Sequence, residues 1–144
     1  MITSKEKAVT NFTPHKEQLV SAKDLATETF DDILLRRFKP YISKEYHIIA
    51  NELGVDISNN PKNKYAMIAN SIASNGKYSN INRSEEFLKA GLTMKTIRIQ
   101  ANGNIKEAMS FENIDYIEVA ECQEWIDSRL YELYSSRFMF VVFR

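Results

Sequence analysis

The chain has 144 residues, enough for one domain with a hydrophobic core, and its 19 basic and 19 acidic side chains give a net charge of zero. A single cysteine, Cys122, and two histidines exclude an internal disulfide, a cysteine zinc cluster and a multi-histidine metal site. No apolar run reaches the roughly 20 residues of a membrane span, and no secretory signal is evident, so we expect a cytoplasmic protein without membrane contact. A neutral chain lacks the overall basic charge typical of nucleic-acid-binding domains, but a local basic surface is compatible with it.

The N-terminal half predicts an arm followed by helices. Residues 1–20 are polar and show no periodicity, which indicates an arm or linker before a domain over 21–144. Apolar residues then recur three and four apart, which predicts three amphipathic helices, over residues 22–42, 44–54 and 64–74. Pro40 should end the first helix, Ser43 should cap the start of the second, and Gly54 should end the second.

The C-terminal half is richer in strands. Its β-branched and apolar runs predict strands over residues 91–99, 107–111, 114–119 and 137–144. The first two would be joined by a turn at 101–104. Helical spacing over 121–134 puts Cys122 and Trp125 on an apolar stripe, which predicts core positions for both. This order of elements indicates a mixed α/β or α+β domain.

The last predicted strand is apolar on both faces, so both faces need cover. We therefore expect that the chain self-associates through this strand or takes up a segment from a partner.

Lys95 stands in the middle of the strand expected at 91–99, on the same face as Thr93 and Ile97. A lysine among apolar neighbours costs desolvation energy unless its ammonium reaches water, a carboxylate or a ligand. It is either an edge-strand lysine that blocks aggregation or a lysine that faces a bound ligand.

Several segments together resemble the MutH/Sau-three-A-I family of GATC-specific DNA endonucleases. They are GLTMKTIRI, KEAMSF, EWIDSRLYELYSSRFMFVVF, FDDILLRRFKPYI and NKYAMIANSIAS, which follow the family's order and cover residues 25–144. They are more similar to the C-terminal, effector half of the restriction enzyme than to its catalytic half. The resemblance implies a restriction-endonuclease-like fold, in which helices flank a mixed central sheet. It also implies a C-terminally truncated chain, because the family continues beyond this point.

The nuclease motif of this family is an acidic residue followed by Glu-X-Lys on the next strand. Two carboxylates hold Mg²⁺, which stabilises charge on the phosphate, and the lysine orients the attacking water or neutralises the phosphate. Lys95 matches the lysine and Thr93 stands at the glutamate position, while Glu86 falls near the first acidic position, with Glu85 as the alternative. Threonine is a poor Mg²⁺ ligand, which leaves Glu86 as the implied metal ligand. We therefore expect that this chain does not bind the Mg²⁺ that the resemblance implies and does not cleave DNA alone.

The resemblance implies sequence-specific binding of GATC duplexes by the effector domain of a type II restriction endonuclease. Its partners would be double-stranded DNA and a catalytic domain or subunit of the same enzyme. An active Mg²⁺-dependent endonuclease is the alternative. Lys77, Tyr78, Arg83 and Arg129 are the candidate DNA contacts, although loop cations can equally be solvated.

Two other classes of protein fit parts of the chain. Residues 46–56 resemble the first helix of a helix-turn-helix, with a recognition helix from Lys64, which would indicate a transcriptional regulator. The gap from Gly54 to Lys64 is longer than the roughly three to four residues of that turn, and a regulator does not need the strands of 91–144. The third class is a protein-interaction module without a DNA role.

Overall fold

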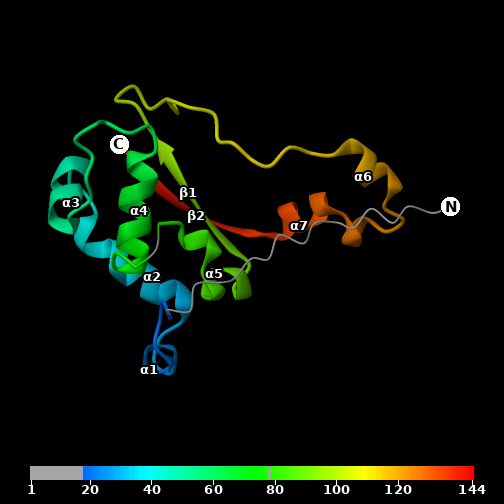
Figure 1. Cartoon of the computed structure of the whole chain (residues 1–144), viewed down its shortest axis with the longest axis horizontal. Coiled ribbons are helices and arrows are strands. Elements are labelled where there is room, and N and C mark those ends of the chain that lie inside the picture. The colour runs from blue at the N-terminus through cyan, green and yellow to red at the C-terminus, as the bar shows by residue number, and fades with distance from the viewer. Residues whose placement is uncertain (1–17, 78) are drawn as a thin grey trace.

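The structure is a computed structural model that describes residues 18–77 and 79–144, and it combines helices with a two-stranded parallel sheet (Figure 1). The helices are α1 (Ala22–Leu25), α2 (Phe30–Phe38), α3 (Tyr46–Leu53), α4 (Lys64–Ser74), α5 (Glu85–Lys89), α6 (Tyr116–Glu121) and α7 (Arg129–Ser135). Single 3-10 turns lie at η1 (Lys39–Tyr41), η2 (Ile81–Arg83) and η3 (Trp125–Asp127), and the strands are β1 (Leu92–Arg98) and β2 (Arg137–Phe143). The expected mixture of helix and strand is therefore present.

The prediction of a single helix over 22–42 is wrong, because the helical structure is interrupted between α1 and α2. Thr29 has an extended backbone, and its hydroxyl accepts a hydrogen bond from the Asp32 amide at 3.2 Å. This N-cap starts a new helix, since a side-chain oxygen satisfies an amide that has no partner within the helix. α2 ends at Phe38, and Pro40 lies in the 3-10 turn that follows it.

The second and third helices match their predictions more closely. α4 has the expected bounds, and Gly54 ends α3 in the left-handed conformation, with φ of 66°. The expected cap at Ser43 is wrong: Ser43 itself has φ of 66°, and Glu45 is the residue before the helix. A left-handed residue three positions before the helix cannot supply the extended backbone that an N-cap needs.

Between β1 and β2 the sequence predicted two strands, over 107–111 and 114–119, and both predictions are wrong. The turn at 101–104 is present, with the Gln100 amide donating to the Asn104 carbonyl at 2.9 Å. Beyond it the chain forms a single bridge, Ile99 to Ile105, and then runs without regular structure to α6. Asp115 caps the start of α6, because its side-chain oxygen accepts hydrogen bonds from the backbone amides of Ile117 (3.0 Å) and Glu118 (3.2 Å).

The helix expected over 121–134 is interrupted at residues 122–124, and α7 begins only after η3. Ser128 caps α7, with its hydroxyl accepting from the Tyr131 amide at 3.0 Å. Cys122 is half-buried and Trp125 is 51% exposed, so the prediction of a core tryptophan is wrong. The apolar stripe has no core to cover here, because α6 and α7 extend away from the other helices (Figure 1).

The core lies on one face of the sheet. Met139, Val141 and Phe143 of β2 pack against the buried cluster of α2, α4, α5 and β1, whose centre includes the fully buried Phe87. The opposite face stays open, with Phe140 47% and Val142 52% exposed. Residues 1–17 of the expected arm lie outside the described residues. Its last two residues, 19 and 20, are buried in the core.

Candidate functional site

Thr93 and Lys95 lie on the open face of the sheet, as their spacing predicts. The register places Thr93 beside Phe138 and Lys95 beside Phe140. The Lys95 ammonium donates to the Ser110 carbonyl at 2.8 Å and lies 5.0 Å from the centre of the Phe111 ring. Lys95 therefore fastens the irregular segment after β1 to the sheet.

Glu86 does not join Lys95 but ties residue 19 to the core. One oxygen of its carboxylate accepts a hydrogen bond from the Leu19 amide at 2.6 Å. Arg37 donates to the Leu19 carbonyl at 2.8 Å and to the Ala73 carbonyl. Burial lowers the pKa of Arg37, while the neighbouring Glu86 carboxylate acts in the opposite direction. Both groups thus hold the incoming chain against the helices.

Glu85, the alternative acidic residue, is also engaged elsewhere. Its carboxylate lies 2.5 Å from the Lys89 ammonium, one helical turn along α5. This hydrogen bond raises the pKa of Lys89, and the attraction of the two charges adds to it. Neither motif carboxylate is therefore aimed at the lysine of the motif.

The residues around Lys95 do not fit the Mg²⁺ site that the resemblance implies. Mg²⁺ prefers carboxylate oxygens in an octahedral arrangement, whereas the motif position beside Lys95 carries the neutral hydroxyl of Thr93. Among residues 18–77 and 79–144, no three His, Cys, Asp or Glu side chains gather in a group that could hold a metal ion. The donor set therefore gives no basis for a catalytic step through this metal.

The cations that the sequence singled out as DNA contacts do not form one surface. Lys77 donates to the Gln18 carbonyl at 3.3 Å, and Arg83 is exposed on η2. Arg129 lies far away on α7, between Glu112 at 2.7 Å and Glu132 at 2.5 Å. Hydrogen bonds to these two carboxylates raise the pKa of Arg129. The other expected contact, Tyr78, lies outside the described residues.

A different basic surface lies where β1 and β2 end. Two hollows, of about 990 and 1270 Å³, meet there, and Tyr65 and Arg98 line both. The carboxyl ends of parallel strands are where ligands bind in open α/β sheets. The cations that line the hollows are Lys44, Lys62, Lys64, Lys95, Arg98, Lys106 and Arg144, against only two carboxylates, Glu45 and Glu107. A positive surface thus exists on a chain of zero net charge.

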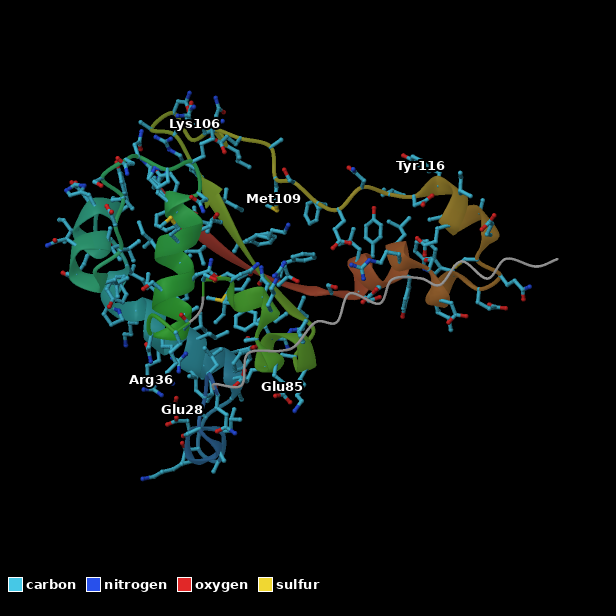
Figure 2. All side chains as sticks on the ribbon, in the orientation of Figure 1. Glu28, Arg36, Glu85, Lys106, Met109 and Tyr116 are labelled. Atoms are coloured by element: carbon cyan, nitrogen blue, oxygen red, sulfur yellow. The ribbon has the colours of Figure 1, made fainter. Side chains whose placement is uncertain are left out.

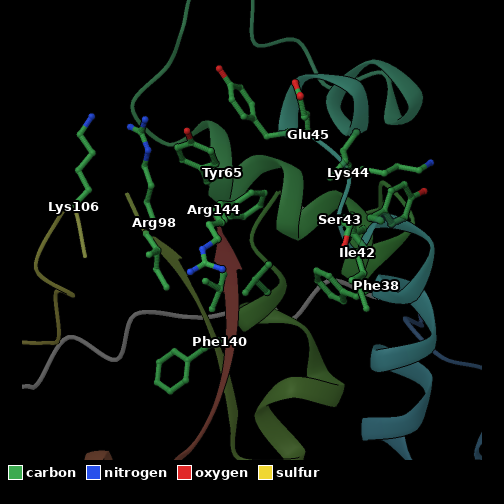
Figure 3. A pocket seen from close by; sticks show the side chains of 18 of the residues that line it. Phe38, Ile42, Ser43, Lys44, Glu45, Tyr65, Arg98, Lys106, Phe140 and Arg144 are labelled. Atoms are coloured by element: carbon green, nitrogen blue, oxygen red, sulfur yellow. The ribbon is translucent and has the colours of Figure 1, made fainter. Parts of the chain in front are cut away.

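Aromatic rings hold part of this surface in place. The Lys64 ammonium lies 4.6 Å from the centre of the Tyr46 ring and 5.3 Å from that of Tyr65. The Arg98 guanidinium lies 5.4 Å from the Tyr65 ring, which also packs on Phe143 at 4.8 Å. Figure 3 shows Arg98 and Lys106 extending toward the same end of the sheet, with Tyr65 beside Arg98. Cation–π contacts position these charges without neutralising them.

Ion pairs neutralise cations mainly in other parts of the molecule. Arg36 pairs with Glu28 at 3.0 Å, at the end of the molecule opposite Lys106 (Figure 2). In the described part of the chain, no carboxylate lies within ion-pair distance of the four cations that we call the basic groove: Lys62, Lys64, Arg98 and Lys106. The positive charge of these four side chains is therefore not neutralised by a carboxylate, although the Lys64 ammonium also donates to the Asn60 side-chain oxygen at 2.7 Å.

Sequence reasoning missed the basic groove, because its members lie far apart in the chain. Lys62 lies just before α4, Lys64 is the first residue of α4, Arg98 ends β1, and Lys106 follows the turn. The pairing of β1 with β2 and the contact of β1 with α4 bring them together. The only available signal was that each cation stands at or near the end of an element.

Comparisons with known proteins do not identify the chain. No protein-family model matches it, and no curated protein matches it. In the part of the chain that the structure describes, no helix is long and apolar enough to cross a membrane.

Proposed function

We propose that this chain is a DNA-binding domain with a restriction-endonuclease-like fold, which binds duplex DNA containing GATC and does not cleave it alone. The observation that carries the proposal is the basic groove on a chain of zero net charge. Nucleic-acid binding requires a local concentration of Lys and Arg, not an overall positive charge. The proposal places the protein in the cytoplasm and includes a catalytic domain or subunit of the same restriction enzyme as its partner.

The basic groove provides contacts to phosphate. Lys and Arg that neutralise phosphates release counterions, so each contact adds about −0.9 to the slope of log affinity against log salt concentration. The four cations of the basic groove and the neighbouring Arg144 are enough to form about three to five phosphate contacts. The sequence preference for GATC is taken from the resemblance, and these phosphate contacts would orient the duplex without reading its bases.

Binding without cleavage follows from the residues around Lys95. Thr93 offers no carboxylate, and Glu86 is engaged with the Leu19 amide. Lys95 itself donates to the Ser110 carbonyl. The alternative of an active nuclease would require all three groups to rearrange.

The transcriptional-regulator alternative receives less support from the helices. α3 and α4 pack together, but residues 54–63 join them instead of a turn of roughly three to four residues. The basic residues at the start of α4 also face the strand end, where Lys64 and Arg98 share the Tyr65 ring.

The test compares two cations of the basic groove with one arginine on the opposite side of the molecule. Arg98→Ala combined with Lys106→Ala should weaken binding of a GATC duplex and make the salt slope less steep by about two units, since two phosphate contacts are lost. Arg36→Ala, which removes a cation outside the basic groove, is the control and should leave both affinity and slope unchanged. Fluorescence anisotropy over a series of salt concentrations measures both quantities. Equal losses in the two variants would show that the basic groove is not the binding surface.

A further inference from the structure

The two outer edges of the sheet differ in whether other residues form hydrogen bonds with their backbone. Asn82 covers the outer edge of β1: its amide donates to the Met94 carbonyl at 3.1 Å, and its oxygen accepts from the Met94 amide at 2.6 Å. The Lys106 amide covers the same edge further along, by donating to the Arg98 carbonyl at 2.9 Å. These contacts block the addition of another strand beside β1.

The outer edge of β2 carries a regular set of free backbone groups. The Arg137 amide donates to Gly91 at 2.9 Å, and the Phe143 carbonyl accepts from Ile99 at 2.8 Å. Successive residues of a strand turn their backbone groups to opposite sides, so Phe138, Phe140 and Val142 direct theirs away from β1. In the described part of the chain, no hydrogen bond to these outward groups is present.

This edge also lacks the features that prevent strands from pairing. Between Arg137 and Arg144, β2 contains no charged residue and no proline. Phe140 and Val142 are half exposed beside the edge. Leu35 (62% exposed) and Ile42 (70% exposed) line the hollow that β2 also lines. Apolar side chains therefore flank an open strand edge.

We propose that β2 pairs with β2 of a second copy of this chain, in antiparallel orientation about a twofold axis at Phe140, to form a continuous four-stranded sheet. A second copy fits because the edge is complementary to itself. Phe140 would lie opposite Phe140 of the other copy, and Phe138 opposite Val142. Aromatic–aromatic and aromatic–β-branched pairs of this kind stabilise antiparallel strands.

The charge of the chain favours the same partner. With a net charge of zero, two copies meet without the overall repulsion that keeps strongly charged proteins apart. Such a contact has the closed twofold symmetry of most homodimers, because the same strand serves both subunits. The inference does not use the basic groove, so it stands or falls independently of DNA binding.

The experiment measures mass in the absence of DNA, by light scattering coupled to size-exclusion chromatography. The wild-type chain should have twice the 16.7 kDa of one chain. Phe140→Lys places a charge at the centre of the proposed pairing and should halve the measured mass. Ile117→Lys, which changes a more exposed apolar residue on α6 (71% against 47% for Phe140), should leave the dimer intact. A monomeric wild type would overturn the proposal, and so would a dimer that dissociates equally in both variants.

Hydrogen exchange on the wild-type protein gives a second readout that does not depend on a variant folding. Pairing protects the outward amides of Phe138, Phe140 and Val142, which face solvent in the monomer. We expect slow exchange at these three amides, becoming faster on dilution. A dimer in which they exchange rapidly at every concentration would contradict the pairing of β2.

Discussion

At the scale of single residues, Asn82 has the clearest structural role. Its side-chain amide takes the place of a neighbouring strand by bonding both backbone groups of Met94, which is 6% exposed. Asn82→Ala leaves a donor and an acceptor without partners and should lower the free energy of unfolding by about 1–3 kcal/mol. Urea denaturation measures the change. Asn113→Ala, at an exposed position, is the control and should change stability by less than about 0.5 kcal/mol.

Thr93 stands at the glutamate position of the nuclease motif, so replacing it with glutamate tests whether the missing carboxylate alone prevents cleavage. Thr93→Glu restores Glu-X-Lys in sequence, but Glu86 stays bonded to Leu19 and Lys95 to Ser110. We therefore expect no Mg²⁺-dependent cleavage of a GATC plasmid by the wild type or by Thr93→Glu. Thr93→Gln is the neutral control of similar size. Cleavage by the glutamate variant but not by the glutamine variant would show that a metal site can assemble around Lys95.

These residues also show what a sequence can reveal. The spacing of two along β1 correctly predicted that Thr93 and Lys95 share a face, because strand periodicity is local. The clamp of Asn82 on Met94 and the bond from Glu86 to Leu19 join residues 12 and 67 positions apart. No periodicity within a single element could predict either contact.

At the scale of elements, prediction succeeded where one side of an element meets the core. α4, β1 and β2 lie where their patterns predicted, and all three border the buried clusters. The segment at 107–111 has the composition of a strand but does not pair with the neighbouring strand β1, because Asn82 and Lys106 already bond the outer edge of β1. Its residues are almost all exposed, so intrinsic preference alone does not make it a strand.

The segment that carries α6 and α7 should be the least stable part of the described chain. Among residues 105–136, the side chain of Ser128 is the only buried one. Local opening costs little where few apolar contacts are broken. Hydrogen exchange with mass spectrometry should therefore show faster exchange in α6 and α7 than in α4 and β1. Equal protection of all four elements would mean that an additional surface covers this segment.

Ser128 is the residue that holds α7 in place. Its hydroxyl accepts from the Tyr131 amide and donates to the Trp125 carbonyl at 2.7 Å, which joins η3 to α7. Ser128→Ala should destabilise this helix by about 0.5–2 kcal/mol. The expected result is faster exchange in α7 with no change in α4. Ser79→Ala, at an exposed position outside the helices, provides the control.

At the scale of the whole molecule, two surfaces stand apart from the core. The basic groove lies at the carboxyl ends of the strands, and the free edge of β2 borders one of the same hollows. The sum of charges in the sequence hides the first surface, because acidic residues elsewhere in the chain bring the net charge to zero. The basic groove could not be predicted until the parallel pairing of β1 with β2 was known, whereas the apolar sequence of residues 137–144 already predicted association through this strand.

The central proposal, DNA binding through the basic groove with preference for GATC, is tested most directly by one titration. Wild-type protein is titrated against a GATC duplex and a scrambled duplex of the same composition over a series of salt concentrations. The proposal predicts tighter binding of the GATC duplex and a slope of log affinity against log salt of about −2.7 to −4.5, equivalent to three to five phosphate contacts. Equal affinity for both duplexes, or no binding at low salt, would contradict it.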